Sequence, residues 1–352
     1  MSTRTSESPE LGGAANSLII YTNTMSKSYR VAIVGASGAV GAEMLRVMER
    51  RNFPVSSLRL LASPRSSGKT LTFRGESHTI KPLNMNSFED IDIAIFSAGG
   101  AISRDFAPEA VRHGAVVVDN SSAFRMHADV PLVVPEINGA DVKNHKGILA
   151  NPNCTTAITL LALYPLHRQF GLKRIFASSY QAVSGAGARA IDELRHQTDC
   201  VAKHKPVLKE IFPHQIAFNV IPQVDSFLDT GYTKEEMKMQ NEGRRIMHLP
   251  NFKASVTCVR TPVYRAHSIA VSAEFEKPVN LEDARAALSK APGLQFLADG
   301  YPMPLDSAGK DDCFAGRLRL DCAMENGLAL WVCGDQLLKG AALNAIQIAE
   351  LL

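Results

Sequence analysis

The 352-residue sequence lacks the patterns that mark several large classes of protein. None of its six cysteines belongs to a Cys-x-x-Cys pair or has a histidine at zinc-ligand spacing, which excludes a zinc module. No apolar run approaches the roughly 20 residues that span a bilayer. The formal net charge is only +3, which argues against an obligatory nucleic-acid or acidic-membrane partner. We therefore expect no metal, no nucleic acid and no membrane.

The cysteines and the first residues bear on the cellular compartment. Six cysteines make disulfides arithmetically possible, but a chain of this length without a secretory apolar segment is typical of a reducing, cytoplasmic setting. Residues 1–28 are rich in Ser, Thr, Gly and Asn, which predicts a disordered extension. Glu7 and Glu10 beside a lone Arg4 argue mildly against a transit peptide, and plastid import stays open.

The first half of the chain alternates between strand and helix patterns. Apolar runs at 29–34, 58–62, 91–96 and 115–119 indicate strands, and helical segments separate several of them. Such alternation predicts an α/β domain with a Rossmann-type, doubly wound parallel sheet.

The second half has a different texture. Strand-like runs at 174–180, 254–259, 268–276 and 328–333 are separated by long polar and helical segments, which predicts an α+β domain on a mixed sheet. The last residues form an apolar helix that we expect to pack back on the first domain. The predicted division is a first domain, residues 29–152 plus 338–352, and a second domain, residues 153–337.

A glycine-rich turn follows the first strand. The run 35–41 has the pattern G-x-x-G-x-x-G between a strand and an expected helix. Glycines there let the backbone approach a dinucleotide pyrophosphate at the helix N-terminus. A tight turn without a ligand is the alternative interpretation. The candidate contacts in this turn are Gly35, Ser37, Gly38, Ala39 and Val40.

The loop after the second strand indicates which dinucleotide binds. Enzymes that prefer NAD usually place an acid about 20 residues beyond the glycines, on the ribose hydroxyls. This loop holds no acid but offers Ser63, Arg65 and Ser66, which suit a 2′-phosphate. We therefore predict NADP, with a solvated basic loop as the alternative. Ser97 and Ala98 follow another strand, at the edge where such sheets hold ligands.

One cysteine is a candidate nucleophile. Cys154 stands in Asn-Pro-Asn-Cys-Thr-Thr, directly before a helical apolar pattern. The positive end of a helix dipole favours thiolate and can lower a cysteine pKa from about 8.5 to roughly 3.5–7.5. A thiolate beside a nicotinamide is equipped for redox chemistry at the acyl level. A small buried hydrophobic residue at a helix start is the alternative.

Six motifs, taken in order, resemble those of aspartate-β-semialdehyde dehydrogenase. They are GASGAVG, NPNCTT, SYQAVSGAG, EEMK, RTPVYRAHS and KGAALNAIQIAE, and the similarity runs from about residue 29 to residue 352. The resemblance implies an NADP-dependent, phosphorylating enzyme that interconverts L-aspartate 4-semialdehyde plus phosphate with L-4-aspartyl phosphate through a thioester. This reaction serves the biosynthesis of Lys, Met, Thr and Ile from aspartate. The resemblance also implies a homodimer formed through the second domain.

The resemblance implies three catalytic residues. Cys154 matches the family's nucleophile, His267 its acid/base residue, and Gln181 the amide that orients the reacting groups. An imidazole with an unperturbed pKa near 6.5 takes and returns protons near neutrality. We accordingly expect Cys154 to react near pH 7 far faster than the other five cysteines.

The resemblance also implies how the substrates are held. Arg260 matches the clamp on the substrate carboxylate, where a guanidinium fork binds in bidentate fashion. Glu235 matches the residue that faces the substrate ammonium, while Arg125 and Lys238 match the phosphate-binding pair. Asn153, beside the nucleophile, completes the expected substrate site.

Three further residues are expected near the nicotinamide. The backbone of Ser184 and Gly185 follows the strand that carries the orienting amide. Gln336 stands where the family pattern commonly has Asn, a departure that can alter a nicotinamide contact.

Two alternative functions remain at this point. An N-acetyl-γ-glutamyl-phosphate reductase uses similar chemistry on a longer, acylated substrate, which has no free ammonium for Glu235 to face. A non-catalytic, cofactor-binding paralogue is expected to lack one of Cys154, Gln181 or His267, and all three are present.

Overall fold

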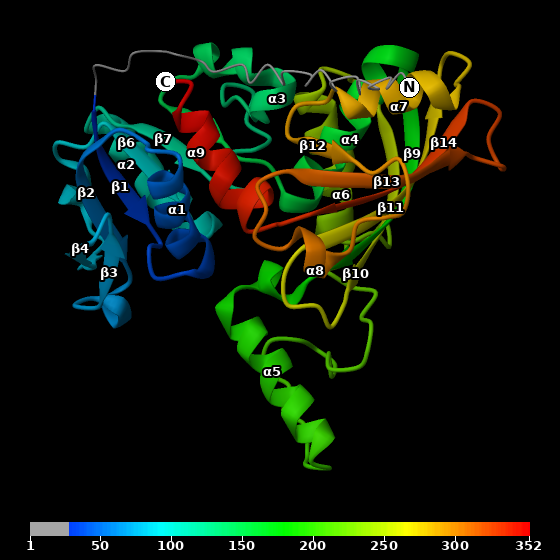
Figure 1. The fold of residues 1–352 in the computed structure, drawn as a ribbon. Coiled ribbons are helices and arrows are strands. Elements are labelled where there is room, and N and C mark those ends of the chain that lie inside the picture. Colours follow the sequence, from blue (N-terminus) through cyan, green and yellow to red (C-terminus); the bar gives the residue numbers. More distant parts are fainter. Residues whose placement is uncertain (1–27) are drawn as a thin grey trace, which may run out of the picture.

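The computed structural model describes residues 28–352, which form two domains lying side by side (Figure 1). The first domain contains a six-stranded parallel sheet with the strand order β5-β2-β1-β6-β7-β8. This confirms the predicted Rossmann-type sheet. Its strands are β1 (Tyr29–Val34), β2 (Val55–Ala62), β5 (Lys81–Pro82), β6 (Ile93–Phe96), β7 (Val116–Asp119) and β8 (Ile148–Ala150).

Helices cover both faces of this sheet. Helices α1 (Ala39–Arg50) and α9 (Leu343–Ala349) share a core cluster with Ile33 of β1. Helix α2 (Gly100–Arg112) packs in a different cluster, which contains Val34 of β1. Because successive side chains of a strand point to opposite faces, the continuous apolar run of β1 contributes to both layers.

The second domain is built on a six-stranded mixed sheet with the order β10-β9-β11-β14-β13-β12. The two outer pairs, β9 with β10 and β12 with β13, are parallel, and the pairs between them are antiparallel. This arrangement confirms the predicted mixed sheet. Its strands are β9 (Leu172–Gln181), β10 (Lys253–Arg260), β11 (His267–Phe275), β12 (Leu294–Phe296), β13 (Cys313–Leu320) and β14 (Gly327–Gly334).

One face of the second sheet is covered by helices, and the other carries exposed apolar side chains. Helices α4 (Cys154–Phe170), α6 (Lys234–Ile246) and α7 (Leu281–Ser289) share a core cluster with the strands. Phe176 and Tyr180 of β9 point to the opposite face, where they are 49% and 39% exposed. Exposed aromatic side chains grouped on one sheet face are typical of a protein–protein interface.

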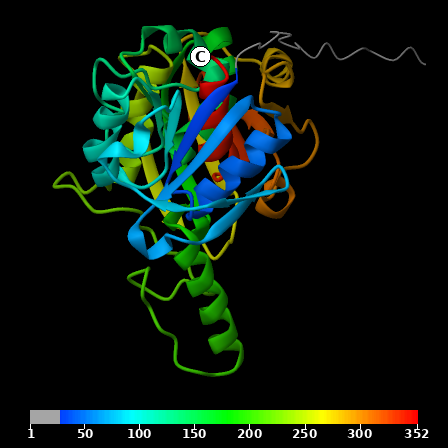
Figure 2. The ribbon, with the colours of Figure 1, turned by 90° about the vertical axis from the view of Figure 1, so that its left-hand side faces the viewer.

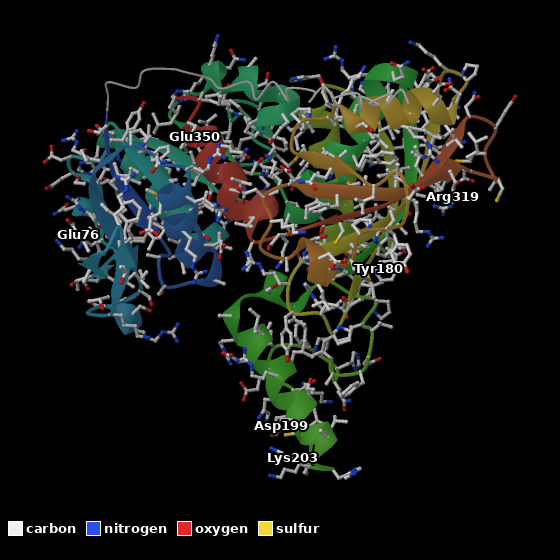
Figure 3. All side chains as sticks on the ribbon, in the orientation of Figure 1. Glu76, Tyr180, Asp199, Lys203, Arg319 and Glu350 are labelled. Atoms are coloured by element: carbon white, nitrogen blue, oxygen red, sulfur yellow. The ribbon has the colours of Figure 1, made fainter. Side chains whose placement is uncertain are left out.

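A helical arm projects from the second domain (Figures 1 and 2). Helix α5 (Ala188–Ala202) runs outward to a tip near Lys203 (Figure 3), and an irregular segment returns to the body. The buried side chains of Glu193 and Gln197 accept hydrogen bonds from backbone N–H groups within residues 210–217. These bonds hold the returning segment against the helix.

Smaller elements complete the fold. An antiparallel hairpin of β3 (Thr70–Phe73) and β4 (Glu76–Thr79), which we did not predict, follows the basic loop. The remaining short elements are α3 (Pro135–Asn138), α8 (Pro304–Ser307), the 3₁₀ turns η1 (Pro64–Ser66), η2 (Met85–Phe88), η3 (Gly139–Asn144) and η4 (Val183–Ala186), and the π-helical turn η5 (Leu338–Ala342).

The C-terminal segment returns to the first domain. Turn η5 and helix α9 contact α1, and in Figure 1 the red C-terminal helix lies beside the blue helix α1. These contacts support the division that we propose, with residues 29–152 and 338–352 in the dinucleotide-binding domain and 153–337 in the other.

The predicted extension, residues 1–28, lies outside the described residues except for Ser28. Within residues 28–352, no helix has both the length and the apolar character needed to cross a bilayer. All six cysteines are free thiols.

Candidate active site

The nucleophile loop ends where helix α4 begins. Cys154 is the first residue of α4, and Asn153 caps the helix by accepting a hydrogen bond from the Thr156 N–H at 3.1 Å. The structure therefore places the cysteine at a helix N-terminus, as the sequence predicted.

The cysteine faces a buried histidine. His267 is the first residue of β11, and its Nε2 lies 3.5 Å from Cys154 Sγ. Its other ring nitrogen, Nδ1, accepts a hydrogen bond from the Ala182 N–H at 3.0 Å. Because Nδ1 is an acceptor, the proton of the neutral ring is on Nε2 and points toward the sulfur. His267 is therefore set up as a hydrogen-bond donor to a group formed at Cys154.

Burial governs the ionisation of both groups. It raises the pKa of the Cys154 thiol to about 11, and the charge of Glu235 adds to this rise. Burial, followed by the positive charge of Arg260, lowers the pKa of His267 to about 3. The predictions of a preformed thiolate and of an imidazole that titrates near neutrality are therefore wrong for this buried pair. The cost of burying a charge exceeds what the helix dipole supplies.

This ionisation state has a measurable consequence. We expect alkylation of Cys154 by iodoacetamide to accelerate about tenfold per pH unit between about pH 7 and pH 9, because the thiolate fraction rises in this way below the pKa. The rate is measured by mass spectrometry of the peptide that contains residue 154. The Glu235→Gln variant should be alkylated faster at each pH, because it lacks a charge that raises the Cys154 pKa. A plateau below about pH 8 in the unmodified enzyme would contradict this.

Arg260 lies beside this pair, at the end of β10. It is 6% exposed, and its Nη1 donates to the Ala182 carbonyl at 2.8 Å. Within residues 28–352 it forms no ion pair, and burial lowers its pKa although the charge of Glu235 acts in the opposite direction. The ring of Phe212, from the helical arm, lies 5.9 Å from the guanidinium carbon. A buried guanidinium with free donors suits a carboxylate ligand.

Gly185 makes this close arrangement possible. A Cβ atom at Gly185 would lie 2.9 Å from Arg260 Nη1 and 3.3 Å from His267 Nε2. Any larger residue would therefore displace the two groups. The sequence predicted Gly185 as a nicotinamide contact, and the structure adds this packing reason for the glycine.

Glu235 is the centre of a hydrogen-bonded cluster. Its Oε1 accepts from Asn153 Nδ2 at 2.9 Å and from Gln181 Nε2 at 3.2 Å, and its Oε2 contacts Lys238 Nζ at 2.7 Å. Burial alone would raise the pKa of Glu235, but Lys238 and the hydrogen bonds outweigh it and lower the pKa to about 2. Lys238 also contacts Asp225 at 3.3 Å. The cluster brings four of the predicted residues together.

Arg125 is held by the same region of the structure. It is 7% exposed and donates to the carbonyls of Asn151 and Asn120 at 2.8 and 2.7 Å. Its Nη1 lies 3.0 Å from Glu242 of α6. Glu242 was not among the predicted residues, although its position seven residues after Glu235 places both on one face of a helix.

These groups surround a cavity of about 420 Å³. Twelve of the predicted residues line it, namely Val40, Ser97, Arg125, Asn153, Cys154, Gln181, Ser184, Gly185, Glu235, Lys238, Arg260 and Gln336. The predicted residues that do not line it are His267, Gly35, Ser37, Gly38, Ala39, Ser63, Arg65, Ser66 and Ala98. The cavity therefore joins the nucleophile to residues of both domains.

The glycine-rich turn fits a dinucleotide. Gly35 has φ +89°, and a Cβ atom there would lie 2.4 Å from the Ser97 carbonyl oxygen. Gly38 caps α1 without any side-chain hydrogen bond, so the helix N-terminus is open to an anion. Arg65 is exposed and, within residues 28–352, has no carboxylate partner, as a 2′-phosphate site requires.

The C-terminal turn supplies two contacts to the site. Gln336 donates to Ser184 Oγ and accepts from the Ala266 N–H at 2.8 Å, which joins two loops of the site. Gly340 was not among the predicted site residues. It lies against the nucleophile, because a Cβ atom there would be only 2.6 Å from the Cβ of Cys154. In the described part of the chain, no group of three or more His, Cys, Asp or Glu side chains is arranged to hold a metal ion.

The fold and the paired residues together define a class. A doubly wound dinucleotide-binding domain joined to a mixed-sheet domain, with a cysteine against a buried histidine, is the architecture of a dehydrogenase that holds its substrate on sulfur. Two family descriptions match the two halves, "Semialdehyde dehydrogenase, NAD binding domain" over residues 30–145 and "Semialdehyde dehydrogenase, dimerisation domain" over residues 163–339. The chain belongs to the aspartate-semialdehyde dehydrogenase family.

Individual relatives support this assignment over almost the whole chain. The aspartate-semialdehyde dehydrogenase of Aquifex aeolicus is 54% identical over 333 residues, which is 92% of this chain and 98% of that protein. That of Synechocystis is 50% identical over 93% of this chain and 98% of that protein. The crystal structure of aspartate semialdehyde dehydrogenase II from Vibrio cholerae superposes with a TM-score of 0.90 at 44% identity, covering 93% and 98% of the two chains.

Proposed function

We propose that this protein interconverts L-aspartate 4-semialdehyde plus phosphate with L-4-aspartyl phosphate, with NADP as the redox cofactor, in amino-acid biosynthesis from aspartate. The observation that carries the proposal is the 3.5 Å contact of Cys154 Sγ with His267 Nε2, beside the buried Arg260. The substrate is supported by the family and by a Vibrio cholerae relative whose structure is a complex with ASA. The open N-terminus of α1 supports NADP, as does Arg65, which has no carboxylate partner in the described part of the chain.

The first half of the reaction forms a thioester. Cys154 loses its proton to solvent, and the thiolate attacks the aldehyde carbon to give a thiohemiacetal alkoxide. His267 Nε2–H donates to this oxygen and stabilises its charge. Bound NADP supplies the acceptor for the hydride that leaves this carbon. The alkoxide then becomes the carbonyl of the thioester, so that His267 needs to accept no proton in this direction.

The second half transfers the acyl group to phosphate. Arg125 and Lys238 hold the phosphate beside the thioester, and Arg260 holds the substrate carboxylate. Attack by phosphate on the thioester carbon breaks the carbon–sulfur bond and returns Cys154 as thiolate. Glu235 faces the substrate ammonium, which requires Lys238 to share or leave its 2.7 Å contact with that carboxylate.

Steady-state kinetics test the proposed function. We expect phosphate-dependent reduction of NADP with L-aspartate 4-semialdehyde, and slower reduction of NAD because Arg65 would have no 2′-phosphate to contact. The N-acetyl-γ-glutamyl-phosphate reductase alternative predicts turnover of the acetylated glutamyl substrate only. Absence of turnover with both substrates would favour a cofactor-binding paralogue.

The substrate clamp provides a separate prediction. Arg260→Lys should lower kcat/KM for the semialdehyde by about 10²-fold, mainly through KM, because an ammonium replaces a bidentate fork. Because the variant keeps the positive charge, the measurement reports only the loss of the bidentate guanidinium geometry. An unchanged KM for the semialdehyde would remove Arg260 from the carboxylate site.

We further propose that the protein is a homodimer and that it functions in the cytoplasm. The exposed apolar face around Phe176 and Tyr180 lies within the region that matches the dimerisation family and supports the dimer. The free state of all six cysteines agrees with a reducing compartment. Sedimentation of the purified protein and fractionation of cells test the two statements.

A further inference from the structure

Glu242 is a buried carboxylate to which the reaction as derived assigns no role. It lies in the last two turns of α6 and is 2% exposed. Its Oε1 is 3.0 Å from Arg125 Nη1, and its Oε2 accepts a hydrogen bond from the backbone N–H of Asn153 at 2.7 Å. One carboxylate therefore joins the Arg125 guanidinium to the residue immediately before the nucleophile.

The surroundings of Arg125 show what this contact does. Arg125 Nε and Nη2 donate to two backbone carbonyls, and Nη1 donates to Glu242, so that three different groups fix the plane of the guanidinium. A guanidinium has five N–H donors, and the side chain lines the cavity, which leaves donors for a ligand. Glu242 is the only one of the three partners that is a side chain and the only one that carries charge. Its removal leaves the other two contacts in place.

Asn153 is held from two sides by the same helix. Its side chain donates to Glu235 at 2.9 Å, and its backbone N–H donates to Glu242 at 2.7 Å. Residues seven apart lie two turns apart on one face of a helix, so α6 presents both carboxylates to the nucleophile loop. Lys238 lies between them on this face. Helix α6 thus fixes the nucleophile loop through Asn153. The same helix carries Lys238 and holds Arg125 through Glu242.

We propose that Glu242 is a positioning residue for phosphate transfer, which aligns Arg125 and the Asn153 peptide so that phosphate reaches the Cys154 thioester. This proposal rests on the proposed function, because it takes Arg125 as a ligand of the substrate phosphate. Glu242 itself is not among the residues that line the cavity. It acts on the step in which the carbon–sulfur bond breaks, and not on cofactor binding.

The test is the Glu242→Gln variant of the full-length enzyme, assayed in the oxidative direction. Glutamine keeps the size and one acceptor oxygen but cannot satisfy both donors as a carboxylate does. We expect the KM for phosphate to rise at least about tenfold and kcat to fall, while the KM for NADP stays within about twofold. In a double-mutant cycle with Arg125→Lys, the effects on the phosphate KM should be strongly non-additive, because the two side chains act through one contact.

Glu236→Gln is the matched control on the same helix. Glu236 is a buried carboxylate whose oxygens accept from the Thr233 and Cys258 N–H groups at 2.7 and 2.9 Å, away from the phosphate position. We expect this variant to lose stability without a selective rise in the phosphate KM. If Glu242→Gln does not fold, Glu242→Asp is the second variant. It keeps the negative charge but moves it away from Arg125 by the length of one methylene group, and it should also raise the KM for phosphate.

The outcomes separate this proposal from the proposed function. Wild-type enzyme without phosphate-dependent NADP reduction would overturn the proposed function itself. Active wild type with an unchanged phosphate KM in Glu242→Gln, or with additive effects in the cycle, would overturn only the positioning role. If Glu242→Gln changed every KM equally, and Glu236→Gln did the same, Glu242 would have a purely structural role. This result would also overturn the positioning role.

Discussion

Replacing Cys154 with alanine is expected to lower kcat by more than about 10⁴-fold while NADPH binds within about twofold of the wild-type affinity. The large effect follows because no second cysteine is among the residues that line the cavity, and the loss of a covalent nucleophile removes a whole reaction path. Cofactor affinity is retained because the glycine-rich turn and the basic loop lie in the other domain. Phosphate-dependent NADP reduction and fluorescence titration with NADPH measure the two quantities.

Two further variants make this result specific. Cys154→Ser keeps a small polar side chain but replaces the sulfur, and it should lose nearly as much activity as alanine. Cys322→Ala removes the exposed cysteine of the β13–β14 turn and should leave kcat unchanged. Substantial turnover in Cys154→Ala would show that the reaction does not pass through this residue.

Replacing His267 is expected to have the second largest effect, and the choice of replacement reports its role. His267→Ala should lower kcat by about 10²–10⁴-fold, the range for a group that serves the reacting atoms in the transition state. His267→Gln should retain more activity than alanine, because an amide N–H can replace the Nε2–H donor. An amide cannot act as a base, so this order of activities identifies His267 as a donor.

The pH profile provides an independent check on His267. With a pKa lowered to about 3 by burial and by Arg260, the imidazole should contribute no acid limb to kcat between about pH 5 and pH 8. Equal activities of the alanine and glutamine variants, together with such a limb, would instead identify a proton acceptor. His248 is an exposed histidine that follows α6, and His248→Ala provides the control. This variant should leave kcat and its pH profile unchanged.

Local sequence patterns predicted most of the strands, and the exceptions have physical causes. Strand β1 has the predicted bounds Tyr29–Val34, because its apolar run is continuous and ends at a glycine. Strand β2 begins at Val55 and not at 58, because its first half is polar and lies near the surface. Strand β13 was not predicted, since exposed arginines interrupt its pattern and a register shift follows Gly316.

The motif residues were sufficient to locate the site in the sequence. The properties of the site that depend on packing, such as the pKa of the nucleophile, could not be predicted from the sequence. The sequence placed Cys154 at a helix start, and this is correct. It did not predict that burial would raise the pKa of that thiol, because burial is decided by residues far away in the chain. The sequence around Gly340 does not indicate that this residue contacts Cys154. A glycine in an apolar helix indicates close packing, but it does not identify the packing partner.

The contact between Gly340 and Cys154 has a consequence for the newly made chain. Cys154 leaves the ribosome long before Gly340, and at about 5–20 residues per second the interval is on the order of ten to forty seconds. During this time the cavity around Cys154 lacks the C-terminal segment that supplies Gln336 and Gly340 to its lining. A nascent chain therefore completes its active site, and gains activity, only when synthesis is nearly finished.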